Sequence, residues 1–174
     1  MPMIAKPSAD EHAPYYGTYI ALTAPDALFA LTEQAKLTQA LLAATPEDRG
    51  GHRYAPGKWS VKEVVGHLSD AERIFAYRAL RFARADTTEL PGFEENLFVP
   101  AANFDARSLA DLAAELAAVR AATVSLFRSF DDAALLRIGS ANHSPMSVRA
   151  AGHAIAGHEL HHVAILRERY GLSG

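Results

Sequence analysis

Residues 157–163 read Gly-His-Glu-Leu-His-His-Val, and His158, Glu159 and His162 form the pattern H-E-x-x-H. Two histidines four residues apart lie on the same face of an α-helix, so their imidazoles can meet at one point. Zinc proteases use this pair as metal ligands and the glutamate as a general base. The pattern therefore indicates either a metalloprotease or another metal site with the same spacing.

A third histidine lies on an apolar helical face elsewhere in the chain. At about 100° per residue, the direction of His67 is shared by Val64, Ala71, Ile74, Phe75 and Phe82. His158 and His162 likewise point with the apolar residues of their own segment. A single histidine in such a place is usually a core residue, but three at similar depth favour a metal site. Three histidine ligands leave a position open for water or substrate, which is the arrangement of catalytic sites. Imidazole suits several divalent ions; we expect zinc or nickel first, then iron or manganese.

The zinc-protease interpretation lacks its other parts. Only twelve residues follow His162, and the metzincin extension would need Gly and His where Ile165 and Glu168 stand. We therefore expect a different enzyme class.

Carboxylates near the predicted ligands are candidates for a general base or for orienting a ligand histidine. We favour the orienting role for Glu159. Asp70, one turn from His67, is a second candidate, although a solvated position is its ordinary alternative, and Glu63 is a third.

Two arginines are candidates for binding an anionic substrate. Arg78 and Arg169 each lie eleven residues beyond an inward histidine, which is ~16 Å along a helix. That distance is too long for contact with a metal-bound water. We therefore expect each arginine either to form an ion pair with Glu33 or Glu115 or to place its charged group at the surface.

Four segments carry helical periodicity and a start signal, at about 26–44, 60–85, 108–130 and 147–170. Ser60 and Glu63 form a capping box at the second start. Strand signals are nearly absent. The sequence thus predicts an all-α four-helix bundle in up-down-up-down order, with the second and fourth helices parallel. The connection 86–107 is longer than neighbouring helices need, and part of it can form an extra helix.

Composition limits the class of protein. We expect one domain, 1–174, with residues 1–25 as an extension packed on the bundle. The net charge of −3 and dispersed basic residues argue against nucleic-acid binding. The chain has no cysteine, and no apolar stretch would span a membrane. We expect a cytoplasmic protein. A homodimer is also expected, because Leu160 and Ala164 lie beside His153, opposite the inward face.

The chain resembles the DinB-like superfamily, which includes YfiT-like metal-dependent hydrolases. The resemblance rests on "KWSVKEVVGHLSDAERIFAYRALRFAR" and "SVRAAGHAIAGHELHHVAIL", with "APYYGTYI", "LPGFEENLF" and "NFDARSLADL" in support. It implies a four-helix bundle that holds a divalent metal through His67, His158 and His162. Some members of the family transfer low-molecular-weight thiols such as bacillithiol, or use mycothiol to isomerise maleylpyruvate.

These observations lead to a metal-dependent enzyme that acts on a small molecule. Hydrolysis and transfer of a low-molecular-weight thiol are nearly equal alternatives. The rival hypothesis is a non-catalytic bundle in which a buried ion stabilises the fold.

Overall fold

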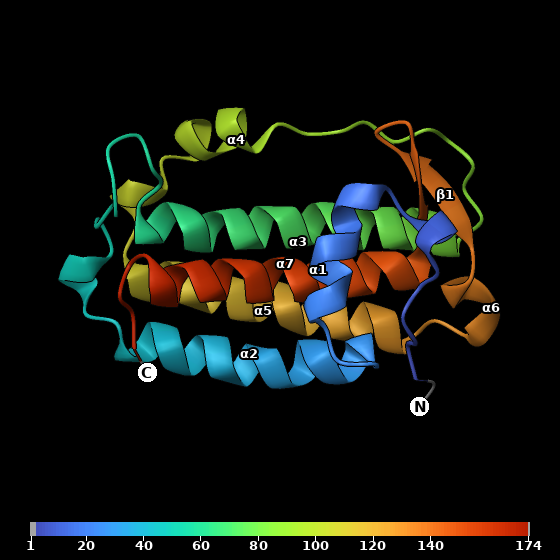
Figure 1. Cartoon of the computed structure of the whole chain (residues 1–174), viewed down its shortest axis with the longest axis horizontal. Helices are drawn as coiled ribbons and strands as arrows, with labels where there is room; N and C mark the ends of the chain where they lie inside the picture. Colours follow the sequence, from blue (N-terminus) through green and yellow to red (C-terminus); the bar gives the residue numbers. More distant parts are fainter. Residues whose placement is uncertain (1–2, 174) are drawn as a thin grey trace.

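The computed structural model describes residues 3–173, and four long helices dominate it (Figure 1). They are α2 (Ala27–Ala44), α3 (Val61–Ala83), α5 (Leu109–Arg128) and α7 (Val148–Glu168). Each starts after a side chain that accepts a hydrogen bond from the first turn, namely Asp26, Ser60, Ser108 and Ser147. The four predicted helices are confirmed, with ends within two residues of the predicted ones. Between residues 3 and 173 no helix combines the length and apolar character that a membrane crossing needs.

Shorter elements connect the long helices. They are η1 (Ala9–Glu11), η2 (Pro14–Tyr16), α1 (Gly17–Leu22), η3 (Glu47–Arg49), α4 (Glu95–Ala102), η4 (Phe104–Ala106) and α6 (Asp132–Leu135). The predicted extra helix in the long connection is α4. Strands β1 (Ile138–Ala141) and β2 (Ser144–Ser147) pair antiparallel, with Ile138 opposite Ser147.

This hairpin corrects the strictly all-α prediction. Its strands have four residues each, which is too short for alternation to stand out in the sequence. Asn142 and His143 form the two-residue turn with φ of 52° and 57°. Turns of this kind are usually recognised by glycine, which is missing here.

The direction of the helices follows from two hydrophobic clusters at opposite ends of the bundle. One cluster joins the end of α2, the starts of α3 and α5 and the end of α7 through Leu41, Val61, Leu109 and Leu166. The other joins the start of α2, the ends of α3 and α5 and the start of α7 through Leu28, Phe82, Phe127 and Val148. Helices α3 and α5 therefore run parallel to each other and antiparallel to α2 and α7 (Figure 1).

The predicted up-down-up-down order, with the second and fourth helices parallel, is therefore wrong. The segment 84–108, which includes α4, returns along the length of the bundle (Figure 1). Helix α5 consequently begins at the same end as α3. Both α2 and α3 pack mainly against α5 and α7.

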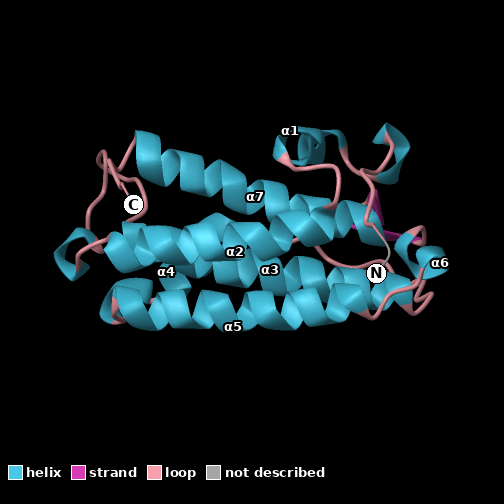
Figure 2. Ribbon diagram, turned by 90° about the horizontal axis from the view of Figure 1, so that it is seen from below, coloured by secondary structure: helices cyan, strands magenta, loops and turns pink. Residues whose placement is uncertain are grey.

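Residues before α2 cover one face of α7, and α1 crosses over that helix (Figure 2). A Cβ at Gly157 would lie 2.1 Å from the carbonyl oxygen of Tyr19, so this approach requires glycine. His153 is fully buried there, with Nδ1 2.8 Å from Thr23 Oγ1 and Nε2 2.9 Å from the Ile4 carbonyl oxygen. Part of the face that we expected to form a dimer is thus covered by the chain itself. The homodimer stays a prediction.

Candidate metal centre

The three inward histidines come together between α3 and α7. His67 Nε2 lies 3.0 Å from His158 Nε2, and His162 Nε2 lies 3.1 Å from the same atom. One nitrogen from each residue can be chosen so that all three lie within 4.8 Å of one another. His67 follows the start of α3, and the antiparallel packing places it opposite the second half of α7.

The two Nε2–Nε2 distances to His158 fit ligands of one ion. Two nitrogens bound at ~2.1 Å are about 3.0 Å apart at a right angle and about 3.4 Å apart at the tetrahedral angle. A neutral Nε2 carries either a proton or a lone pair. Two nitrogens that face each other at this distance repel unless a proton or a cation lies between them.

Burial keeps these rings neutral. It lowers the pKa of His67 to about 4 and the pKa of His162 to about 3. The pKa of His158 falls well below its usual value, first through burial and then through the neighbouring histidines. Metal ligation requires the neutral imidazole. The donor set therefore fits a divalent metal ion, although it does not distinguish zinc from nickel.

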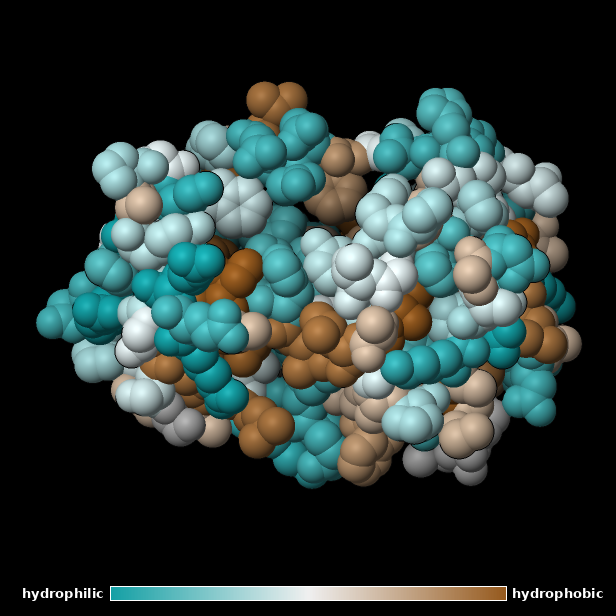
Figure 3. Space-filling model, viewed as in Figure 1, coloured by the Kyte–Doolittle hydropathy of each residue, from teal (hydrophilic) through white to brown (hydrophobic). Residues whose placement is uncertain are grey.

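A cavity of about 450 Å³ opens beside the three rings, and we call it the histidine cavity. Aromatic residues form much of its wall, and the other lining side chains are polar: Tyr15, Tyr16, Tyr19, Trp59, Phe75 and Phe93, with Arg78, Glu95, Asn142 and His161. The Trp59 ring centroid is 4.8 Å from that of His67. The molecular surface is hollowed on the side where segment 84–108 passes over α3 (Figure 3).

Several of the lining residues were not identified from the sequence. Glu95 belongs to α4, Asn142 to the hairpin turn, and Tyr16 and Tyr19 to the N-terminal extension. The signals for Glu95 were the unusual length of its connection and its place in the segment "LPGFEENLF", and neither indicated a role for this residue. Asn142 had none, because the hairpin itself was not predicted.

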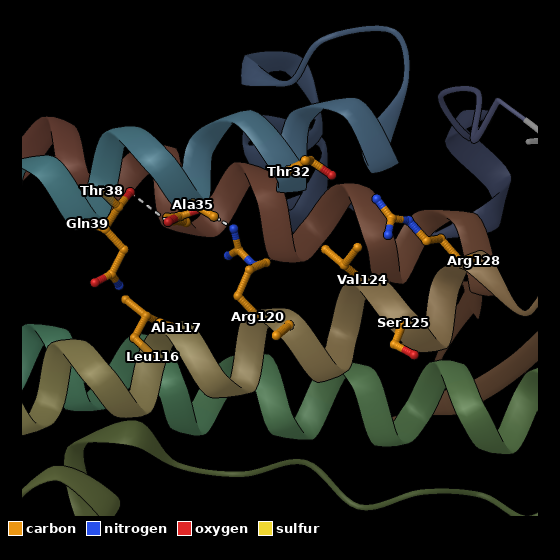
Figure 4. Close-up of a pocket in the computed structure, with 12 residues that line it drawn as sticks. Thr32, Ala35, Thr38, Gln39, Leu116, Ala117, Arg120, Val124, Ser125 and Arg128 are labelled. Carbon is orange, nitrogen blue, oxygen red and sulfur yellow. Dashed lines mark hydrogen bonds and ion pairs between the residues drawn. The ribbon is translucent and has the colours of Figure 1, made fainter.

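Glu159 lies on the other side of α7, facing α2 and α5. It is 3% exposed, accepts a hydrogen bond from Thr38 Oγ1 at 2.7 Å and pairs with Arg120 Nη1 at 2.9 Å. Arg120 also forms two hydrogen bonds with Glu72, of 2.9 and 2.8 Å. Figure 4 shows Arg120 and Thr38 at a second cavity, of about 400 Å³, to which Glu159 contributes. Both carboxylate oxygens of Glu159 are thus bonded within the bundle.

The other two carboxylate candidates also have structural partners. Asp70 is half-buried, and its Oδ1 lies 3.7 Å from Arg73 Nη1. It is not among the described residues that line the histidine cavity. Glu63 completes the capping box with Ser60 and pairs with Arg53 at 2.5 Å.

The expectation for Arg78 needs correction. Glu33 pairs with Lys36, and Glu115 pairs with Arg73 and Arg107, so neither reaches Arg78. Arg78 is instead 2% exposed and lines the histidine cavity. Arg169 is exposed, which agrees with the second expected alternative, a charged group at the surface.

Comparisons with known proteins agree with this fold. YfiT from Bacillus subtilis, described as a probable metal-dependent hydrolase with an unusual four-helix bundle topology, is similar to this chain with a TM-score of 0.71. The two are 19% identical, and the match covers 97% of this chain and 94% of that one. At this identity the likeness shows the fold. No protein of curated function matches the sequence. A family model described as the DinB superfamily matches residues 30–166, which include all three histidines, and the chain therefore belongs to the DinB superfamily.

Proposed function

We propose that this protein is a metal-dependent hydrolase of a small molecule, with a divalent ion held by His67, His158 and His162. The observation that carries the proposal is the position of three neutral imidazoles at the wall of a 450 Å³ cavity. A catalytic metal site has this form, with three protein ligands and an open position. A purely structural site would be closed by a fourth ligand.

The chemistry requires a metal and a base. A divalent ion, when bound, polarises a substrate carbonyl and lowers the pKa of a bound water toward ~7. Glu95 lines the cavity and can accept the proton of the attacking water. Burial and the charge of Glu95 raise the pKa of Tyr19, so its phenol stays protonated and can donate a hydrogen bond. Trp59 and Phe75 give the same space an apolar wall.

The carboxylate in the cavity favours hydrolysis over thiol transfer. A thiol bound to a metal loses its proton to the solvent readily and needs no positioned base. Glu95 beside Tyr19 would have no role in that reaction. Thiol transfer, the identity of the metal and the cytoplasmic location stay predictions.

Metal content is the first test. Elemental analysis of the purified protein should find near-stoichiometric zinc or nickel, which is lost in His67→Ala and in His162→Ala. His143→Ala is the matched control, because that imidazole is 92% exposed on the hairpin turn. A fully loaded His67→Ala protein would contradict the ligand set.

Turnover is the second test. The metal-loaded protein should hydrolyse at least one member of a panel of small esters and amides, and the metal-free protein should not. Addition of low-molecular-weight thiols to the same panel separates the two reactions. Turnover only with a thiol present would favour transfer, and full metal loading without any turnover would favour a structural ion.

A further inference from the structure

We propose that Arg78 is a carboxylate-binding residue of the histidine cavity, so that the substrate is a small carboxylic acid whose reacting group reaches the three histidines. This inference rests on the proposed function for its metal end and goes beyond it by naming the substrate class.

The first argument is the state of the Arg78 side chain. It is 2% exposed, and a guanidinium keeps its charge at any ordinary pH. Within residues 3–173, no Asp or Glu oxygen comes within the 4.0 Å of an ion pair with Arg78. Glu89 feels its charge only at longer range and accepts a hydrogen bond from His143 N at 2.8 Å. Buried charges in proteins normally have a partner, so a site with this cation is completed by an anion.

The contacts that Arg78 does make leave donors for a ligand. Nη2 donates to the Pro91 carbonyl oxygen at 2.9 Å, and Nη1 makes a long contact of 3.5 Å with the Tyr16 hydroxyl. The guanidinium also lies over the rings of Phe75 and Phe93, with Cζ 5.6 and 5.9 Å from their centroids. A guanidinium has five N–H donors, and these contacts use two of them. The aromatic faces support the cation without neutralising it.

The reach from Arg78 to the histidines sets the size of the ligand. The Phe75 ring centroid is 6.4 Å from the His158 ring centroid and 5.6 Å from Arg78 Cζ. The His158 ring centroid and Arg78 Cζ are therefore at most 12.0 Å apart. A carboxylate paired with the guanidinium takes about 4 Å of this span, and an ion on Nε2 takes about 3 Å. If the carboxylate and the ion both lie on the line between these two points, the carboxylate carbon and the ion are at most about 5 Å apart. The ~16 Å expected from the sequence is the separation of His67 and Arg78 along the helix axis. The Arg78 side chain extends back toward the helix start, which shortens its reach to the histidines.

The groups beside Arg78 in the histidine cavity favour a carboxylate over a more highly charged anion. A planar carboxylate pairs with one guanidinium through two parallel hydrogen bonds. Tyr16, whose pKa is raised by burial, remains a phenol that can donate a third. A phosphate of charge near −2 would need more cations than the one arginine that lines this cavity.

The test uses the cobalt-substituted protein, in which a thiol that binds the ion gives a charge-transfer band. Titration compares 3-mercaptopropionate with 1-propanethiol, which lacks the carboxylate. In the wild-type protein the carboxylate should strengthen binding about tenfold or more. This advantage should fall to less than about twofold in Arg78→Met, while the affinity for 1-propanethiol is unchanged. Arg84→Met, an exposed arginine at the end of the same helix, should keep the advantage.

Two further ligands sharpen the result. 6-Mercaptohexanoate can bridge the same span only with its longer chain folded, which costs conformational entropy, so its advantage should be smaller than that of 3-mercaptopropionate. In 2-mercaptoethanesulfonate the anion is not planar, and binding as tight as that of 3-mercaptopropionate would overturn the assignment to carboxylates. Equal affinity of the wild-type protein for 3-mercaptopropionate and 1-propanethiol would overturn the proposal itself. If Arg78→Met does not fold, Arg78→Gln replaces it, since glutamine can still donate to Pro91.

A metal-free arm separates this inference from the proposed function. Trp59 is the single tryptophan of the chain and lines the cavity, so its fluorescence reports binding there. Metal-free wild-type protein should bind 3-phenylpropionate more tightly than 3-phenylpropanol, and Arg78→Met should not distinguish them. If cobalt does not bind but this preference is present, the metal site fails and the carboxylate site stands. If cobalt and thiols bind without any preference for carboxylates, the carboxylate site alone fails.

Discussion

Arg120 and Glu159 form an ion pair of 2.9 Å at the centre of the bundle. The same guanidinium binds Glu72 and donates to the Leu31 carbonyl oxygen at 3.0 Å, so one side chain of α5 contacts the other three long helices. Arg120→Met would leave two buried carboxylates without their cation. We expect a loss of about 3–5 kcal/mol in the free energy of unfolding, measured with urea. Arg128→Met, at an exposed position of the same helix, should change it by less than about 0.5 kcal/mol.

Glu95 and Asp70 can be compared as candidate bases. Only Glu95 is among the residues that line the histidine cavity. Glu95→Gln should lower kcat about 100-fold or more without loss of metal, because the amide cannot accept the proton. Asp70→Asn should leave kcat within about threefold. The reverse order of the two effects, measured on any substrate found in the ester and amide panel, would assign the base to Asp70.

The metal-free protein should lose stability as the pH falls below neutrality. Burial places the pKa of His67 at about 4 and that of His162 at about 3, both below the ~6.5 of an exposed histidine. The unfolded chain therefore takes up protons that the folded chain does not. This contribution to stability is complete above pH ~6.5 and decreases below it, by up to about 1.4 kcal/mol per pH unit for each histidine.

Urea unfolding of the metal-free protein at pH 7, 6 and 5 measures this dependence. The double variant His67→Gln, His162→Gln should show a flatter profile between these values. A wild-type profile as flat as that of the variant would show that the two rings titrate normally in the folded protein.

The contact of α1 with α7 depends on Gly157. A methyl group there would meet the Tyr19 carbonyl oxygen at 2.1 Å, which is backbone and cannot rotate away. Gly157→Ala should therefore lower the free energy of unfolding by about 1–3 kcal/mol. Gly51→Ala is the matched control, because nothing lies within 4 Å of its added methyl group. Equal thermal stability of the two variants would mean that α1 moves aside at no cost.

The long helices and the pairing of His158 with His162 could be predicted because their signals are local. Capping residues such as Ser60 and Ser147 mark the starts, and spacing along one helix places His158 beside His162. The direction of the helices could not be predicted in this way. It depends on the path of segment 84–108, and nothing in its sequence specifies that it runs back along the bundle.

The roles of Glu159 and Arg78 could not be predicted for a related reason. Glu159 matched a catalytic pattern, but its partners Thr38 and Arg120 are 121 and 39 residues away in the sequence. Arg78 was placed on the correct face, but the sequence could not show that its expected partners are bonded elsewhere. Contacts between distant segments decide which polar residues are structural and which are available to a ligand.

The origin of the cavity walls has a consequence for the evolution of this fold. The three histidines belong to α3 and α7, whose packing holds the bundle together, whereas Phe93, Glu95 and Asn142 lie on connecting segments at its surface. Connecting segments accept substitutions and insertions far more readily than core helices do. Duplicated genes can therefore diverge in what they recognise while they inherit the same three-histidine cluster intact. One bundle can in this way give rise to many selectivities without passing through an unstable ancestor.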